Sequence, residues 1–153
     1  MKFLVFLLVL LSLAPLPAAA QSREETIDFL ISEYRAFESR GYQFKAIAFS
    51  PAGDSFTLRR SAYGERGYQV SFNLKDVEIY KVTLNQANGI NKYQLMVRSR
   101  GRDTSMTKDG NIVKTPLKIS PAMENEKKAE ALERAFTRLT VLTTGRKFLF
   151  YTP

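Results

Sequence analysis

The apolar residues of this chain repeat with two different periods, and this change of period constrains the fold more than any other feature. At 23–40 and 121–144 they recur every three or four positions, which is typical of amphipathic helices. Between 42 and 119 they recur every second position, the period of strands with one buried face. Each helix has a single apolar stripe and must cover a sheet. We therefore predict an α+β fold rather than α/β.

Both predicted helices carry sequence signals at their ends. Ser22 and Glu25 have the spacing of a capping box, in which each side chain bonds to the backbone N–H of the other residue. Gly41 supplies a stop for the first helix. Ser120 and Pro121 have the form of the N-cap and first position of the second helix. The expected apolar stripes are Ile27, Leu30, Ile31, Tyr34 and Phe37, then Leu132, Ala135, Phe136, Leu139 and Leu142.

The central region predicts about seven strands in an antiparallel meander, which forms a curved sheet or a partly open barrel. Gly and Asn/Asp-Gly between the strands accept the positive φ of tight turns. The alternation is clearest at 68–74, where the even-numbered residues face the core. Between Ile79 and Tyr80 the apolar parity changes, which predicts a β-bulge or a bend. The expected strands are 42–49, 55–62, 67–74, 77–84, 91–99, 103–107 and 111–119.

The first residues have the pattern of a secretory signal peptide. Lys2 precedes an apolar run at 3–13, and Ala18 and Ala20 are small residues at the positions that a signal peptidase reads. The apolar run is shorter than the roughly 20 residues that a membrane-spanning helix needs. We therefore expect residues 1–20 to be a cleaved signal peptide.

The remaining residues, 21–153, are then expected to form one globular domain without a transmembrane segment, periplasmic or secreted. The chain has no cysteine and no histidine. This excludes disulfides, thiol catalysis and cysteine metal sites, and it removes the usual general base and transition-metal ligand. Asp76 and Glu78 form the only close carboxylate pair in the strand region, and a carboxylate-based hydrolase would use them as general acid and base. Asp76 is better explained as a turn residue. We predict neither an enzyme nor a cofactor or metal site.

Positive charge is concentrated in the middle of the chain. Without Lys2 the net charge is +7, and residues 41–120 carry thirteen basic against six acidic residues. A solvated, solubilising face is one interpretation. The other is attraction to an anionic partner, namely lipid headgroups, an acidic polysaccharide or an acidic protein. Nucleic acid is not an expected partner of an exported domain.

Two groups of arginines are the candidate anion- or partner-binding residues. Arg98, Arg100 and Arg102 alternate, so in an extended strand they project from one face and could bind phosphate, sulfate or carboxylate. Charges at a strand end can instead discourage edge pairing. Arg59 and Arg60 are adjacent, so they point to opposite faces of a strand, and the alternative for them is a solvated hairpin.

A loose pattern in the chain resembles a known family of barrels. The strand and polar-Asp-Val turn at 72–77, the strands at 93–97 and 117–119, and the helix at 129–142 are similar to the pleckstrin-homology and GRAM-type fold. The resemblance covers about 42–144. It implies a partly open barrel that a C-terminal amphipathic helix plugs at one end.

Some members of that family bind phosphoinositides through basic residues between their first two strands. The corresponding loop here, 50–54, has no Lys or Arg, so the resemblance implies the fold alone. A cystatin-like or NTF2-like sheet wrapped around its leading helix is the alternative layout. The apolar segment 148–151 is expected either to pack on the core or to contact a partner.

The functional prediction is an exported, non-enzymatic binding domain that engages a protein partner or an anionic surface through a basic face. The alternative is a carrier that holds a small apolar ligand between sheet and helix, which the aromatic content of 11 Phe and 7 Tyr permits.

Overall fold

The structure is a computed structural model that describes residues 22–40, 44–50, 53–62, 65–101 and 106–145. Two helices enclose eight strands in chain order within these ranges. The elements are α2 (Arg23–Ser39), β1 (Phe44–Phe49), β2 (Ser55–Ala62), β3 (Glu65–Asn73), β4 (Val77–Leu84), β5 (Lys92–Ser99), β6 (Thr107–Lys108), β7 (Asn111–Ile112), β8 (Leu117–Lys118) and α3 (Glu126–Thr144).

The strands form two antiparallel sheets. The first has the order β1-β2-β3-β6-β7 and the second has the order β4-β5-β8. After β3 the chain leaves the first sheet and forms the β4–β5 hairpin of the second sheet. It then adds β6 and β7 to the first sheet and β8 to the second. The predicted α+β class with a leading and a closing helix is confirmed. The predicted meander is divided between two sheets, and they do not close into a barrel.

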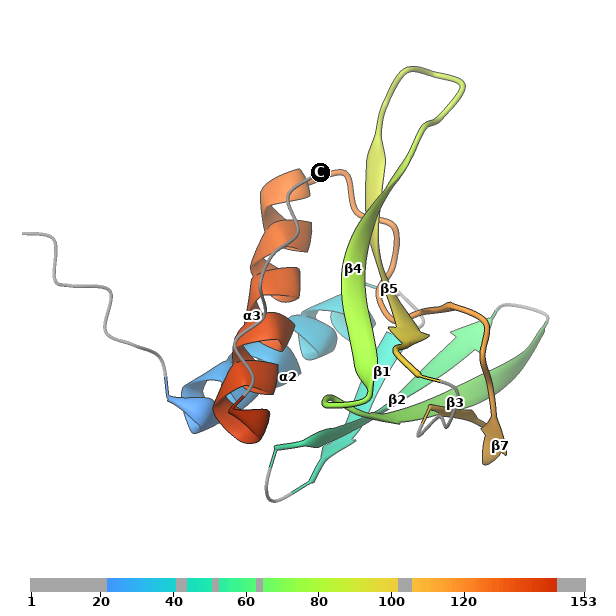
Figure 1. The fold of residues 1–153 in the computed structure, drawn as a ribbon. Coiled ribbons are helices and arrows are strands. Elements are labelled where there is room, and N and C mark those ends of the chain that lie inside the picture. Colours follow the sequence, from blue (N-terminus) through green and yellow to red (C-terminus); the bar gives the residue numbers. More distant parts are fainter. Residues whose placement is uncertain (1–21, 41–43, 51–52, 63–64, 102–105, 146–153) are drawn as a thin grey trace, which may run out of the picture.

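Each helix is fixed at its start by a side chain. In α2 the predicted capping box is confirmed: Ser22 Oγ accepts from Glu25 N at 3.1 Å, and Glu25 Oε2 accepts from Ser22 N at 2.7 Å. In α3 the N-cap is Asn125, whose Oδ1 accepts from Lys128 N at 3.1 Å. The two helices pack against each other, α2 also covers β1, and α3 covers β4 and β5 (Figure 1).

Phe56 of β2 lies at the centre of the core. Its ring centroid is 5.5 Å from that of Tyr34 in α2, 5.3 Å from that of Phe136 in α3 and 5.5 Å from that of Phe72 in β3. The ring centroid of Phe49 in β1 lies 4.6 Å from that of Phe56. Rings from both helices and three strands therefore fill the space between the helices and the first sheet. As predicted for 68–74, the even-numbered side chains of this segment face the core: Val70, Phe72 and Leu74 are buried in it, and the partly buried Tyr68 packs against it.

The predicted start of the second helix at Ser120 and Pro121 is wrong. Ser120 is fully buried, and its Oγ accepts from Leu95 N at 2.8 Å and donates to Pro121 O. The backbone groups of Met123 pair with those of Tyr93, so this segment continues alongside β5. A Ser-Pro pair marks a helix start only if the chain turns there, and here backbone pairing with β5 delays the turn.

The predicted bulge between Ile79 and Tyr80 is also wrong. β4 pairs with β5 in an unbroken register from Val77 to Leu84. On the core-facing side of β4 the apolar pattern ends at Lys81, which bonds to carboxylates of α3 in place of an apolar contact. The register shifts occur instead in β1, between Ala46 and Ala48, and at the end of the β2–β3 pair.

The turn of the β4–β5 hairpin projects beyond the helices and the first sheet (Figure 1). No helix in the described part of the chain is both long and apolar enough to cross a membrane. The predictions for residues 1–20, for Gly41 and for 148–151 lie outside the described residues.

Candidate functional site

Three side chains at one end of the first sheet form a basic cluster: Arg60 of β2, Tyr68 of β3 and Lys108 of β6. Arg60 Nη1 donates to Tyr68 Oη at 3.1 Å, and its Cζ lies 5.5 Å from the centroid of the Tyr68 ring. Lys108 Nζ lies 4.5 Å from the same centroid. The pairing of Arg60 with Tyr68 and of Lys108 with Val70 places all three on the core-facing side of the sheet.

Aromatic rings, rather than carboxylates, hold the two cations of the basic cluster. Arg60 Cζ also lies 5.7 Å from the centroid of the buried Phe44 ring. In the described part of the chain neither Arg60 nor Lys108 forms an ion pair with a carboxylate. A ring attracts a cation by about 0.5–1 kcal/mol at exposed sites but leaves its positive charge in place. The basic cluster can therefore still attract an anion.

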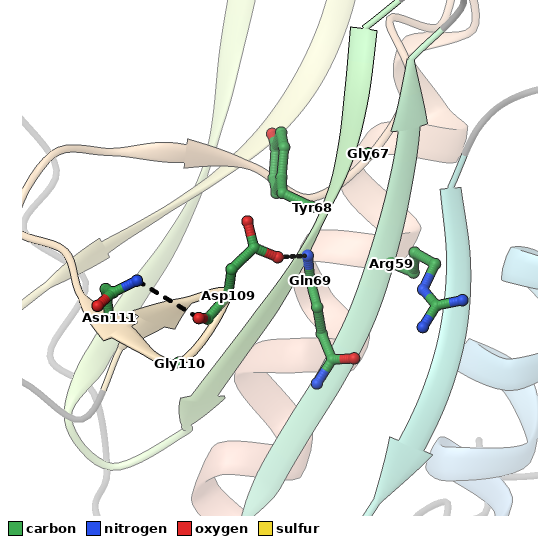
Figure 2. Close-up of a pocket in the computed structure, with 7 residues that line it drawn as sticks. All are labelled: Arg59, Gly67, Tyr68, Gln69, Asp109, Gly110 and Asn111. Carbon is green, nitrogen blue, oxygen red and sulfur yellow. Dashed lines mark hydrogen bonds between the residues drawn. The ribbon is translucent and has the colours of Figure 1, made fainter.

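Arg59 points to the opposite face of the same sheet, as predicted for two adjacent residues. Its register partner is Gln69 of β3, and both side chains are exposed. Next to them lies an open depression of about 860 Å³, which we call the outer depression. It is lined by Arg59, Gly67, Tyr68, Gln69 and the turn 109–111 (Figure 2).

The turn of the β6–β7 hairpin forms one wall of the outer depression. Asp109 and Gly110 have φ values of 51° and 80°, and they connect a Lys108–Asn111 register pair. These are the features of a two-residue type I′ turn, which an Asp-Gly sequence favours. Asp109 Oδ1 accepts from Gln69 N at 2.8 Å, and Asp109 N donates to Gln69 O at 2.8 Å. This double contact fixes the turn against β3 (Figure 2).

The three alternating arginines do not form a common anion site in the described structure. Arg98 of β5 is paired with Glu78 of β4, with 2.8 Å between Nε and Oε2. The hydrogen bond to this carboxylate raises the pKa of Arg98. Arg100 lies beyond the end of β5, and its Nε donates to Val77 O at 2.6 Å. Arg102 lies outside the described residues.

Glu133 of α3 has a role similar to that of Arg100 along β4, the edge strand of the second sheet. Its carboxylate accepts a hydrogen bond from Lys81 N at 2.9 Å. Both charged side chains thus satisfy backbone groups of an edge strand, which protects it from pairing with another chain. Of the three strand-end arginines, Arg100 alone is seen to bond to the backbone of this edge strand among the described residues.

Sequence reasoning missed Lys108 and Tyr68. Lys108 was only one of thirteen basic residues in the central region, and Tyr68 was assigned to the core. Their role depends on the pairing of β3 with β6, which no local pattern predicts. Asp76 and Glu78, the predicted carboxylate pair, have different surroundings. Glu78 forms an ion pair with Arg98, whereas Asp76 lies in the turn between β3 and β4. No group of metal-ligating side chains is found among the described residues.

Comparison with known proteins adds no relative to this description. No family model, no curated protein and no solved structure matches the chain.

Proposed function

We propose that this chain is a non-enzymatic binding domain that engages an anionic partner through the basic cluster. The observation that carries the proposal is the convergence of Arg60 and Lys108 on one partly exposed tyrosine without a carboxylate partner in the described part of the chain. A guanidinium beside an ammonium offers several N–H donors to a phosphate, sulfate or carboxylate group.

The charge of the chain supports the same proposal. The formal net charge is +8, and the excess lies in the residues that form the sheets. A positive field of this kind raises the rate of encounter with anionic partners and weakens with salt. Export through a signal peptide, which we also propose, favours lipid headgroups, acidic polysaccharide or an acidic protein over nucleic acid as the partner.

The relation to the pleckstrin-homology and GRAM-type fold remains a proposal about the architecture. It is supported by two antiparallel sheets followed by a closing amphipathic helix. The leading helix α2, which covers β1, is additional to that fold.

The test is binding to anionic vesicles and to a sulfated polysaccharide as the salt concentration rises. Between about 0.01 M and about 1 M salt the Debye length falls from about 30 Å to about 3 Å, so binding should weaken steeply. The double variant R60Q/K108Q should weaken low-salt binding about tenfold, since a hydrogen bond to a charged group contributes about 1.5 kcal/mol.

The matched control is R35Q/K127Q, which removes the same charge from exposed positions of the two helices. It should bind nearly as tightly as the wild type, with both variants checked for unchanged unfolding. If the two double variants weaken binding equally, attraction follows net charge alone and the basic cluster is not the site.

A further inference from the structure

The strand β4 carries apolar side chains on both of its faces. Ile79 packs against the core. Tyr80, Val82 and Leu84 lie on the opposite face, because successive side chains of a strand alternate, and all three are partly exposed. Met96 of β5 pairs with Tyr80 and extends this second apolar surface. We call Tyr80, Val82, Leu84 and Met96 the apolar sheet face. Strands that are apolar on both sides are typical of sheets that are covered on both sides.

The helix α3 covers only the other face of β4. Lys81 lies on that inner face, where its ammonium group bonds to Glu126 and Glu130 of α3. Among the described elements, β5 and α3 are the main neighbours of β4. The apolar sheet face therefore lacks a covering layer in the described structure, and a contiguous apolar surface of this kind marks an interaction site. We propose that it binds an acidic amphipathic helix of a partner protein.

Positive charge borders the apolar sheet face. Lys118 of β8 pairs with Met96, so it lies on the same face, and it forms no ion pair with any residue that the structure describes. Lys92 pairs with Leu84 at the other end, and its Nζ is 3.9 Å from Glu124 Oε1, a long contact. Both ammonium groups can therefore bond to carboxylates of a ligand that packs on the apolar side chains.

A second copy of the chain fits this face less well than an acidic partner does. Glu78, the carboxylate on the same face of β4, is paired with Arg98, so the lysines of another copy would find it engaged. The formal net charge of +8 adds repulsion between copies. The apolar segment 148–151 of the chain itself follows Arg146 and Lys147, and 146–153 contains no Asp or Glu. A partner with acidic residues matches the charge.

The edge of β4 favours a helix over an added strand. Glu133 accepts from Lys81 N, and Arg100 Nε donates to Val77 O. An added strand would need these same backbone groups. A helix packs on the face of a sheet and needs no free edge. α3 shows this arrangement on the inner face, where glutamates of a helix bond to a lysine of β4.

The hairpin turn argues against a lipid surface as the occupant. Residues 85–89 project beyond the helices and the first sheet (Figure 1), and they are Asn, Gln, Ala and Gly. Ile90 is the single large apolar side chain that is exposed beside them. Even a myristoyl chain, which is much larger, gives only marginal membrane binding. The apolar side chains of the proposed site lie along the strands, where a protein surface can cover them.

The experiment measures binding of the full chain to two labelled synthetic peptides by fluorescence anisotropy. Both peptides are helices of about 18 residues with one stripe of leucines, roughly five turns long. Glutamates border the stripe in the acidic peptide, and lysines replace them in the basic peptide. We expect the acidic peptide to bind at least about tenfold more tightly than the basic one, because only its charges are complementary to the border of the apolar sheet face.

Substitutions within the site and outside it locate the peptide. Val82→Glu should weaken binding of the acidic peptide at least about tenfold, because it buries an unpaired carboxylate. Val82→Thr, which keeps the charge and a β-branched side chain, should weaken it severalfold. Lys118→Glu should weaken the acidic peptide about fivefold and strengthen the basic one. The controls are Ile112→Thr in the first sheet and Lys127→Glu on α3, both at exposed positions, and they should bind as the wild type does.

Three results would overturn the inference. The first is equal binding of the two peptides, or binding of the acidic peptide that neither Val82 variant weakens. The second is loss of binding to phosphatidylcholine and phosphatidylglycerol vesicles in Val82→Thr, which would assign the face to lipid. The third is a dimer in sedimentation that Val82→Thr dissociates, which would assign it to a second copy. None of these results depends on the basic cluster, so the proposed function is tested separately by R60Q/K108Q.

Discussion

At the scale of single residues, several side chains have roles that their local sequence does not indicate. Ser120 looks like a helix cap but joins the segment after β8 to β5. Tyr34 looks like a stripe residue of α2, and its buried hydroxyl also donates to Ile119 O. Burial raises the pKa of Tyr34, so this phenol stays protonated and keeps its donor. Such contacts fix one element to another and add specificity to the core.

Ser120→Ala should lower the free energy of unfolding by about 1–3 kcal/mol, because it leaves the buried Leu95 N–H without its acceptor. Asn125→Ala, which removes the actual N-cap of α3, should cost about 1 kcal/mol. Urea denaturation followed by circular dichroism measures both. A smaller effect of Ser120→Ala than of Asn125→Ala would contradict the buried role of this serine.

At the scale of elements, the contact between β4 and α3 depends on charge. Lys81 Nζ donates to Glu126 Oε1 at 2.6 Å and to Glu130 Oε1 at 3.2 Å. The hydrogen bond from Lys81 lowers the pKa of Glu126, and the hydrogen bond to Glu126 raises the pKa of Lys81. This ion pair therefore stabilises the fold at pH values between the pKa of Glu126 and the pKa of Lys81, and it weakens outside that range.

This contact predicts a pH dependence of stability. Because the pKa of Glu126 in the fold lies below its ordinary value of 4.5, the stabilisation is present above pH 4.5 and is lost as the pH falls through the lower folded value. Glu126→Gln should therefore destabilise the chain at neutral pH, and the difference from the wild type should shrink as the pH falls below 4.5. Urea denaturation at several pH values measures this difference.

The control is the same substitution in a Lys81→Met background. Without the ammonium group, the effect of Glu126→Gln on the pH dependence of stability in this acidic range should become much smaller, because only the weaker hydrogen bond with Tyr93 is left to lower the pKa of Glu126. A difference that keeps its full size in that background would assign the effect to another group.

The elements also show how far sequence reasoning reached. The α2 capping box and the bounds of β2 and β4 follow from neighbours within a few positions, and all were predicted correctly. The division into two sheets depends on pairs such as Val70 with Lys108 and Val97 with Leu117, which are distant in sequence. Arg59 and Arg60 could be identified as candidates because they are adjacent in the sequence. The basic cluster was found only in the structure, because it also needs Lys108, which the pairing of β3 with β6 brings into place.

At the scale of the whole molecule, one core connects both helices with the first sheet. The rings around Phe56 come from α2, α3, β1 and β3, and the second sheet adds the buried Leu95 and Val97 to the same core. No element has a separate core of its own in the described part of the chain. The helices and the sheets should therefore unfold together rather than in separate steps.

Phe56→Ala tests this cooperativity, because it removes a fully buried ring from the centre of the core. It should lower the free energy of unfolding by about 3–5 kcal/mol, the usual range for a buried Phe. Ile112→Ala, at a side chain that is 66% exposed, should change it by less than about 0.5 kcal/mol. In urea, far-UV circular dichroism and tyrosine fluorescence should shift to the same lower midpoint in Phe56→Ala. If the fluorescence transition moves while the far-UV transition stays in place, the secondary structure does not depend on this core, and the single-core description is wrong.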